Sequence, residues 1–176
     1  MAFIVDGTGN VISFAEYVDV TTIDQRVFEA NEGLTVDIVE DMLERSTNRM
    51  IQKIKASDWW REYSNFTGAG YGSLSDLPTP NPNLFLRQAD WTECCVYHTL
   101  TNYLYPKIAN FSDAESAEVE KIKFFDVRFQ DLFNELLSMG DFYDADGDGT
   151  VESNEKLVKY ALTRRTRGRK SIVRVK

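Results

Sequence analysis

The acidic segment from Asp144 to Glu155 constrains the fold more than any other part of this sequence. Aspartates occupy positions 1, 3 and 5 of this twelve-residue stretch, a glycine position 6 and a glutamate position 12. This is the pattern of the EF-hand calcium loop, which joins two helices and takes oxygen ligands at positions 1, 3, 5, 7, 9 and 12. Three carboxylates within five residues repel one another unless a hard cation lies among them. The predicted Ca²⁺ ligands are Asp144, Asp146, Asp148, the Thr150 carbonyl, Glu152 and Glu155.

Apolar residues flank this loop at helical spacing, which favours an EF-hand-type unit over an Asp-Gly-rich turn that never holds metal. They are Leu136, Leu137, Phe142 and Tyr143 before the loop, and Leu157, Val158, Ala161 and Leu162 after it. A calcium sensor usually pairs two such loops, and the sequence has no second one. We therefore interpret the loop as a structural clip that fixes the direction of the segment after it.

Helical periodicity and helix-end signals predict several further helices. One spans Thr22 to Glu32, a second begins at Thr35, and a third begins at Ser57 or Asp58. A fourth begins near Asp90 and ends or kinks at Pro106, and the longest runs from the capping box 112–115 to Gly140. The expected packing stripe of the second helix is Val36, Val39, Leu43, Met50 and Ile54. Trp59, Trp60 and Tyr63 load the third with aromatic side chains, which we expect to seal a core or a subunit contact. The buried face of the fourth is expected at Trp91, Cys94, Cys95, His98, Leu100, Tyr103 and Leu104. The longest helix is predicted from an apolar series at helical spacing: Val119, Ile122, Phe125, Phe129, Leu132, Phe133, Leu136 and Leu137.

Two parts of the chain do not follow a helical pattern. The segment 3–12 places short β-prone runs around a Gly-Asn-rich turn, which predicts a hairpin or arm. The segment 65–83 is rich in Gly, Ser, Pro and Asn, so we expect a long irregular loop there. The prediction is a mostly α protein: a bundle of about four to five helices with an N-terminal hairpin, an EF-hand-type loop and an extended basic tail.

The 176 residues are enough for one core, and we expect one domain with appendages. Residues 1–17 form the N-terminal arm, 18–162 the helical domain and 163–176 the tail. No apolar run is long enough to span a membrane, and residues 1–10 lack the features of a signal peptide. We therefore expect a soluble protein made in the cytoplasm.

Charge is divided unevenly along the chain. All 28 acidic residues lie at or before Glu155, where the net charge is −17, whereas the last 21 residues carry +9 and no acid. This pattern predicts that the tail contacts an anionic partner, either an acidic protein surface, including that of a sister copy, or nucleic acid. The residues expected to make this contact are Arg164, Arg165, Arg167, Arg169, Lys170, Arg174 and Lys176.

The sequence gives little support for catalysis. Cys94 and Cys95 are adjacent, which suits reduced core thiols better than a disulfide or a metal site. His98 is the sole histidine, and we expect it to be a hydrogen-bonded core residue. The glycines match no phosphate-binding motif, and no spacing singles out a carboxylate acid and base. We predict that the protein is not an enzyme.

Three features resemble the head-to-tail adaptor, or connector, proteins of tailed bacteriophages. They are the helix ending 51–54 before Asp58-Trp59-Trp60, the core helix 91–105 with its Tyr-Leu-Tyr-Pro ending, and the long helix leading to the Tyr-Asp-Ala-Asp-Gly-Asp-Gly turn at 143–149. The resemblance covers roughly residues 18–162.

This resemblance implies a non-catalytic virion protein at the head-tail interface. Such adaptors form a ring of about twelve copies between the portal protein and the neck or tail-completion proteins. Genomic DNA passes through the ring without sequence-specific binding, and no membrane is involved. The alternative function is a stand-alone single EF-hand calcium-binding regulatory protein, which would be a compact monomer.

Overall fold

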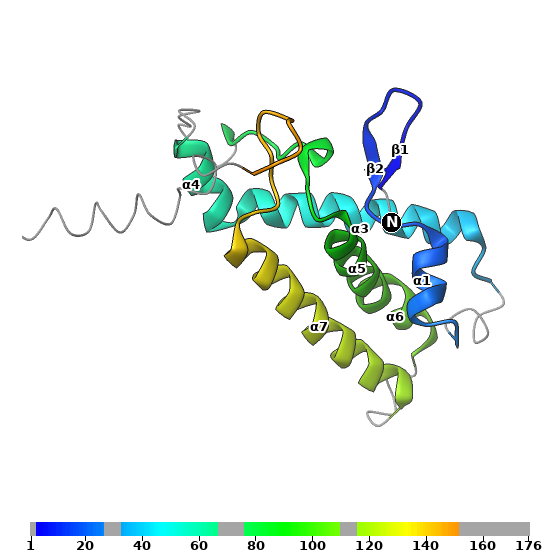
Figure 1. Ribbon diagram of the computed structural model, residues 1–176. Coiled ribbons are helices and arrows are strands. Elements are labelled where there is room, and N and C mark those ends of the chain that lie inside the picture. Colours follow the sequence, from blue (N-terminus) through cyan, green and yellow to red (C-terminus); the bar gives the residue numbers. More distant parts are fainter. Residues whose placement is uncertain (1–2, 27–32, 67–75, 110–115, 152–176) are drawn as a thin grey trace, which may run out of the picture.

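The computed structural model describes residues 3–26, 33–66, 76–109 and 116–151, and it confirms a mostly helical fold with a small N-terminal antiparallel sheet (Figure 1). The sheet pairs β1 (Ile4–Val5) with β2 (Val11–Ser13). The helices are α1 (Tyr17–Ile23), α3 (Val36–Ala56), α4 (Asp58–Phe66), α5 (Gln88–Thr99), α6 (Tyr105–Ile108) and α7 (Ala117–Met139). A 3₁₀ turn covers Pro82–Leu84, and a π-helical segment covers Leu100–Leu104. No helix among the described residues combines the length and apolar character that a membrane span requires.

Helix α3 follows the sequence prediction closely. The Thr35 hydroxyl accepts a hydrogen bond from Ile38 N at 3.4 Å, as expected of an N-cap. The predicted stripe of Val39, Leu43, Met50 and Ile54 is buried. The prediction that Val36 is buried was wrong, because this first residue of the helix lies outside the packed stretch and is 47% exposed.

The start of helix α5 differs from the prediction near Asp90. The helix begins two residues earlier, and Arg87 precedes it with a left-handed φ of 59°. Asp90 does not cap the helix, because its carboxylate accepts a hydrogen bond from Arg87 Nε at 2.8 Å. At the other end, the helix passes into the π-helical segment before Pro106, whose ring nitrogen has no hydrogen to donate. Pro106 lies in the first turn of α6, so the helical stretch continues past it to Ile108.

Helix α7 ends at Gly140, as predicted, with a left-handed φ of 65°. Its start is capped by Ser116, whose hydroxyl accepts from Val119 N at 3.4 Å. The predicted capping box 112–115 lies outside the described residues. Phe125, Phe129, Phe133 and Leu136 are buried.

The helix predicted over Thr22 to Glu32 is described only as far as Arg26. Helix α1 lies earlier and ends at Ile23, and Asp24 adopts an extended conformation. The Asp24 carboxylate accepts hydrogen bonds from Tyr105 Oη of α6 and Lys121 Nζ of α7, which hold this residue at the end of α1. Residues 27–32 lie outside the described residues.

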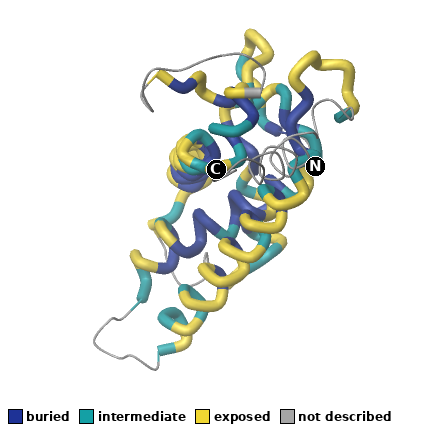
Figure 2. Tube along the Cα trace, turned by 90° about the vertical axis from the view of Figure 1, so that its left-hand side faces the viewer, coloured by how far each residue is buried: buried dark blue, intermediate teal, exposed yellow. Residues whose placement is uncertain are grey.

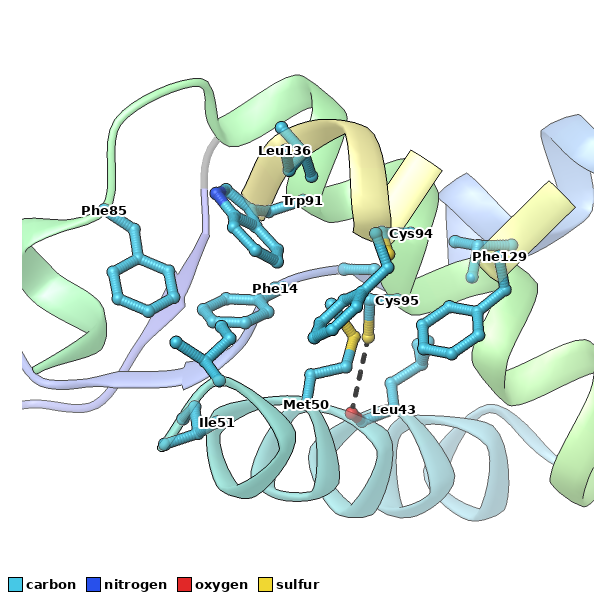
Figure 3. Packing of buried hydrophobic residues seen from close by; sticks show 14 of the residues in the cluster. Phe14, Leu43, Met50, Ile51, Phe85, Trp91, Cys94, Cys95, Phe129 and Leu136 are labelled. Atoms are coloured by element: carbon cyan, nitrogen blue, oxygen red, sulfur yellow. Dashed lines mark hydrogen bonds between the residues drawn. The ribbon is translucent and has the colours of Figure 1, made fainter. Parts of the chain in front are cut away.

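The core lies where α3, α5 and α7 meet and continues to the base of the hairpin (Figures 2 and 3). Trp91 on α5 contacts the rings of Phe14, Phe85, Phe133 and Phe142. The free thiols of α5 are buried as expected: Cys94 and Cys95 are shielded from solvent, and Cys95 Sγ lies 3.7 Å from Leu43 O. Burial raises the pKa of Cys95 to about 12, so this thiol stays protonated.

His98 is buried between α3 and α7 and is hydrogen-bonded, as predicted. Its Nδ1 lies 3.1 Å from Ser46 Oγ, and its ring packs against Phe129. Burial, together with the charges of Lys53 and Arg49, lowers its pKa from 6.5 to about 4. The folded state therefore holds His98 neutral in a pH range where the unfolded chain protonates it.

We expect His98 to contribute to acid destabilisation. Its contribution is fully present above pH 6.5 and is lost as the pH falls through 6.5 towards 4. The loss amounts to roughly 3 kcal/mol, at about 1.4 kcal/mol per pH unit. Unfolding free energies of wild type and His98→Gln, measured by urea denaturation between pH 7 and 4, should converge as the pH falls. Parallel curves would contradict the expectation.

Gly140 holds a position that a side chain would strain. A Cβ there would lie 2.9 Å from Trp59 Nε1, and the left-handed φ itself disfavours other residues. Gly140→Ala should therefore lower the unfolding free energy by about 2 kcal/mol. Gly7→Ala is the control, because a Cβ there meets no atom within 4 Å. Equal stabilities of the two variants in chemical denaturation would count against this account of the turn.

Candidate metal centre

Four residues, 140–143, separate α7 from the predicted calcium loop, and two of them are aromatic residues that anchor the loop in the core. Phe142 and Tyr143 are buried. The Phe142 ring lies 4.4 Å from Trp59 and 5.1 Å from Trp91, measured between ring centroids. Tyr143 packs edge-on against Trp60 at 5.1 Å. Helices α4 and α5 thus hold the chain immediately before the first predicted ligand.

Backbone hydrogen bonds join the start of the loop to the segment before α5. Leu86 N donates to Phe142 O at 2.7 Å, and Asp144 N donates to Leu84 O at 3.0 Å. Between them, Phe85 and Tyr143 form an isolated antiparallel β-bridge. This pairing joins residues nearly sixty positions apart, so the position of Asp144 is fixed by the fold as well as by its neighbours in sequence.

The Asp144 carboxylate organises the loop around itself. Its side chain is 2% exposed, and its two oxygens accept hydrogen bonds from Gly149 N at 2.6 Å and Gly147 N at 2.8 Å. Gly147 and Gly149 have φ values of 77° and 90°, which side chains rarely adopt. Gly149 was predicted to make the sharp turn, and the contribution of Gly147 was missed.

The three predicted aspartates lie together. Asp144, Asp146 and Asp148 each offer a carboxylate oxygen, and these oxygens all lie within 4.8 Å of one another. Ca²⁺ binds oxygen at 2.3–2.6 Å, so two ligands of one ion lie up to about 5 Å apart. Asp146 and Asp148 are exposed, whereas Asp144 is buried. The donor set is entirely carboxylate, which suits a hard cation such as Ca²⁺ better than zinc or copper.

The pKa values of the cluster reflect mutual repulsion and local hydrogen bonding. Burial would raise the pKa of Asp144, but hydrogen bonds from Gly149 and Gly147 outweigh it and lower the pKa. For Asp146, the hydrogen bond from Asp148 N lowers the pKa, but contacts with the Asp144 and Asp148 carboxylates raise it overall. A cation between these carboxylates would remove the repulsion.

The remaining predicted ligands are described only in part. Thr150 donates its N–H and its hydroxyl to Asp148 Oδ1, both at 2.8 Å, so it braces the loop. Glu152 and Glu155 lie outside the described residues, as do the predicted helix at 157–162 and all seven basic tail residues. The structure thus brings together the first half of the predicted ligand set.

An ion-pair clamp at the end of α7 was missed by sequence reasoning. Arg87 Nη1 lies 3.1 Å from Asp141 Oδ1, and Arg87 Nε lies 2.8 Å from Asp90 Oδ2. The guanidinium thereby ties the residue after Gly140 to the first turn of α5. No local pattern points to this clamp, because Arg87 and Asp141 are far apart in sequence and meet only in the fold.

Comparisons with known proteins found no match for this chain among protein-family models, curated proteins or solved structures. The resemblance to phage adaptors therefore remains a prediction from the sequence.

Proposed function

We propose that this chain is a non-catalytic structural protein of a tailed-phage virion, an adaptor that forms a ring between the portal and the neck. In this proposal, the loop beginning at Asp144 binds one Ca²⁺ ion and fixes the direction of the basic C-terminal segment. The single observation that carries the calcium part is the buried Asp144 carboxylate, held by two loop amides beside Asp146 and Asp148.

The surroundings of the loop favour a clip over a calcium-triggered switch. A sensor exposes an apolar groove when its helices move apart on binding Ca²⁺. Here Phe142 and Tyr143 are already packed against aromatic residues of α4 and α5. Backbone hydrogen bonds join Phe142 to Leu86 and Asp144 to Leu84. Opening such a groove would break these contacts.

The charge distribution supports the adaptor part of the proposal. A net charge of −17 before Lys156 suits a channel wall past which DNA slides without sticking. The +9 segment suits a contact with the portal or with the acidic body of a neighbouring subunit. The ring and the partner proteins in this proposal rest on the sequence resemblance to phage adaptors, with which the helical fold is compatible.

Electron microscopy of the purified full-length protein and of phage particles tests the adaptor role. We expect rings in the purified protein or at a capsid vertex, and a solution mass well above that of the 20.2 kDa chain. A strictly monomeric protein that is absent from particles would overturn the adaptor role and favour the regulatory alternative.

A DNA-binding assay tests the proposed role of the tail. We expect weak DNA binding by the full-length protein at physiological salt, because the acidic body opposes it. A steep salt dependence that disappears when residues 164–176 are removed would assign the tail to nucleic acid instead.

A further inference from the structure

The 3₁₀ turn Pro82–Leu84 contacts both the N-terminal hairpin and the candidate calcium loop. The two elements are at opposite ends of the sequence, yet both lie on the same side of α3 (Figure 1). The turn is itself well defined: the Asn81 side chain caps it by accepting from Asn83 N at 3.1 Å, and Leu84 N donates to Asn81 O. It is therefore placed to connect the hairpin with the loop.

Hydrogen bonds of Asn83 and Leu84 connect the hairpin with the candidate calcium loop. On one side, Val11 N in β2 donates to Asn83 Oδ1 at 2.8 Å. On the other side, Leu84 O accepts from Asp144 N at 3.0 Å. A Cβ placed on Gly147 would lie 3.7 Å from Leu84 Cδ2, so the Leu84 side chain also borders the loop. Adjacent residues of one turn thus bind the hairpin and the first calcium ligand.

Aromatic contacts of Phe85 connect the base of the hairpin with the same loop. The Phe85 ring lies 5.5 Å from Phe14, which follows β2, and 5.7 Å from Tyr143, which precedes Asp144. Phe14, Phe85 and Tyr143 are all buried. Protein cores are close-packed, so a displacement of Tyr143 is transmitted through Phe85 to the base of the hairpin.

We propose that Ca²⁺ binding at the Asp144 loop also holds the N-terminal hairpin in its docked position, through Asn83 and Phe85. The inference rests on the proposed calcium site and adds a second element controlled by it. Ca²⁺ needs the Asp144 carboxylate as a ligand, so its binding favours the conformation in which Asp144 N is hydrogen-bonded to Leu84 O. That hydrogen bond in turn stabilises the turn whose Asn83 side chain accepts a hydrogen bond from Val11 N. The loop then fixes the hairpin as well as the segment that follows the loop.

Amide hydrogen exchange of the full-length protein, with and without Ca²⁺, tests this inference. The reporter is the Val11 amide, and the reference is the Asp24 amide, which bonds to Val20 O in α1. We expect Ca²⁺ to slow exchange at Val11 by at least about fivefold relative to Asp24, the lower end of typical coupling between sites. In Asn83→Ala this selective effect should be smaller, because only the Phe85 contacts then connect the loop with the hairpin, although Ca²⁺ still binds.

Asn134→Ala, at an exposed position on α7, is the matched control and should behave like wild type. Equal slowing at Val11 and Asp24 would show global stabilisation alone and would overturn the inference. So would Ca²⁺ binding that leaves Val11 unchanged, or a selective effect of the same size in Asn83→Ala as in wild type. A calorimetric titration that detects no Ca²⁺ binding would overturn both this inference and the calcium site.

Discussion

Replacing Phe85 by alanine should lower the unfolding free energy by about 3–5 kcal/mol, the range for a large-to-small change at a buried aromatic residue. Phe85 is 1% exposed, and its ring contacts Phe14, Trp91, Phe142 and Tyr143. These neighbours come from the residue after β2, helix α5 and the segment just before the candidate calcium loop, and they cannot close the cavity without breaking other contacts. Urea denaturation of full-length wild type and variant measures the difference.

Phe124→Ala provides the matched control, because it removes the same side chain from an exposed position. Phe124 lies on α7 and is 53% exposed. Its loss should change the unfolding free energy by no more than about 0.5 kcal/mol. A Phe85→Ala variant as stable as Phe124→Ala would show that the packing between hairpin, α5 and loop is not as described.

Asp144→Ala should remove calcium binding and the stabilisation that it provides. Loss of a supporting residue near a bound metal weakens affinity 10- to 100-fold, so loss of a direct ligand should weaken it more than about 100-fold. The variant also leaves the amides of Gly147 and Gly149 without their acceptor, so the loop is less ordered even without the ion. Wild type should gain about 2.7 kcal/mol at a Ca²⁺ concentration of 100 times Kd, and the variant almost nothing.

Thermal unfolding with and without Ca²⁺ checks this prediction. Asp126→Ala is a suitable control, because Asp126 is an exposed aspartate on α7 and should leave the calcium effect intact. The same Ca²⁺-dependent stabilisation in Asp144→Ala and wild type would place the ion elsewhere.

The elements predicted well from the sequence are those determined by short-range signals. Helix α3 has a capping threonine and a regular apolar stripe, and Gly140 ends α7 with the left-handed conformation that glycine favours. The aspartates of the loop were found because one continuous motif carries them, and their spacing alone brings the oxygens together.

The features that the sequence did not reveal depend on distant contacts. Asp24, directly after α1, binds Tyr105 and Lys121, which follow it by 81 and 97 residues. The left-handed Arg87 is held by Asp90 and Asp141, and a local pattern offers no reason for it. Likewise, the pairing of Leu84 with Asp144, which anchors the candidate site, requires the complete fold.

Calorimetric titration of Ca²⁺ into the full-length protein shows whether the loop that begins at Asp144 binds the ion. Asp146 and Asp148 are exposed, so the double variant Asp146→Asn with Asp148→Asn should leave the fold intact. The matched control is the double variant Asp126→Asn with Asp131→Asn, which changes two exposed aspartates on α7. We expect wild type and the α7 double variant each to bind one Ca²⁺ ion per chain. The affinity of the loop double variant for Ca²⁺ should be weaker by more than about 100-fold. No binding by wild type, or equal binding by all three proteins, would contradict this expectation.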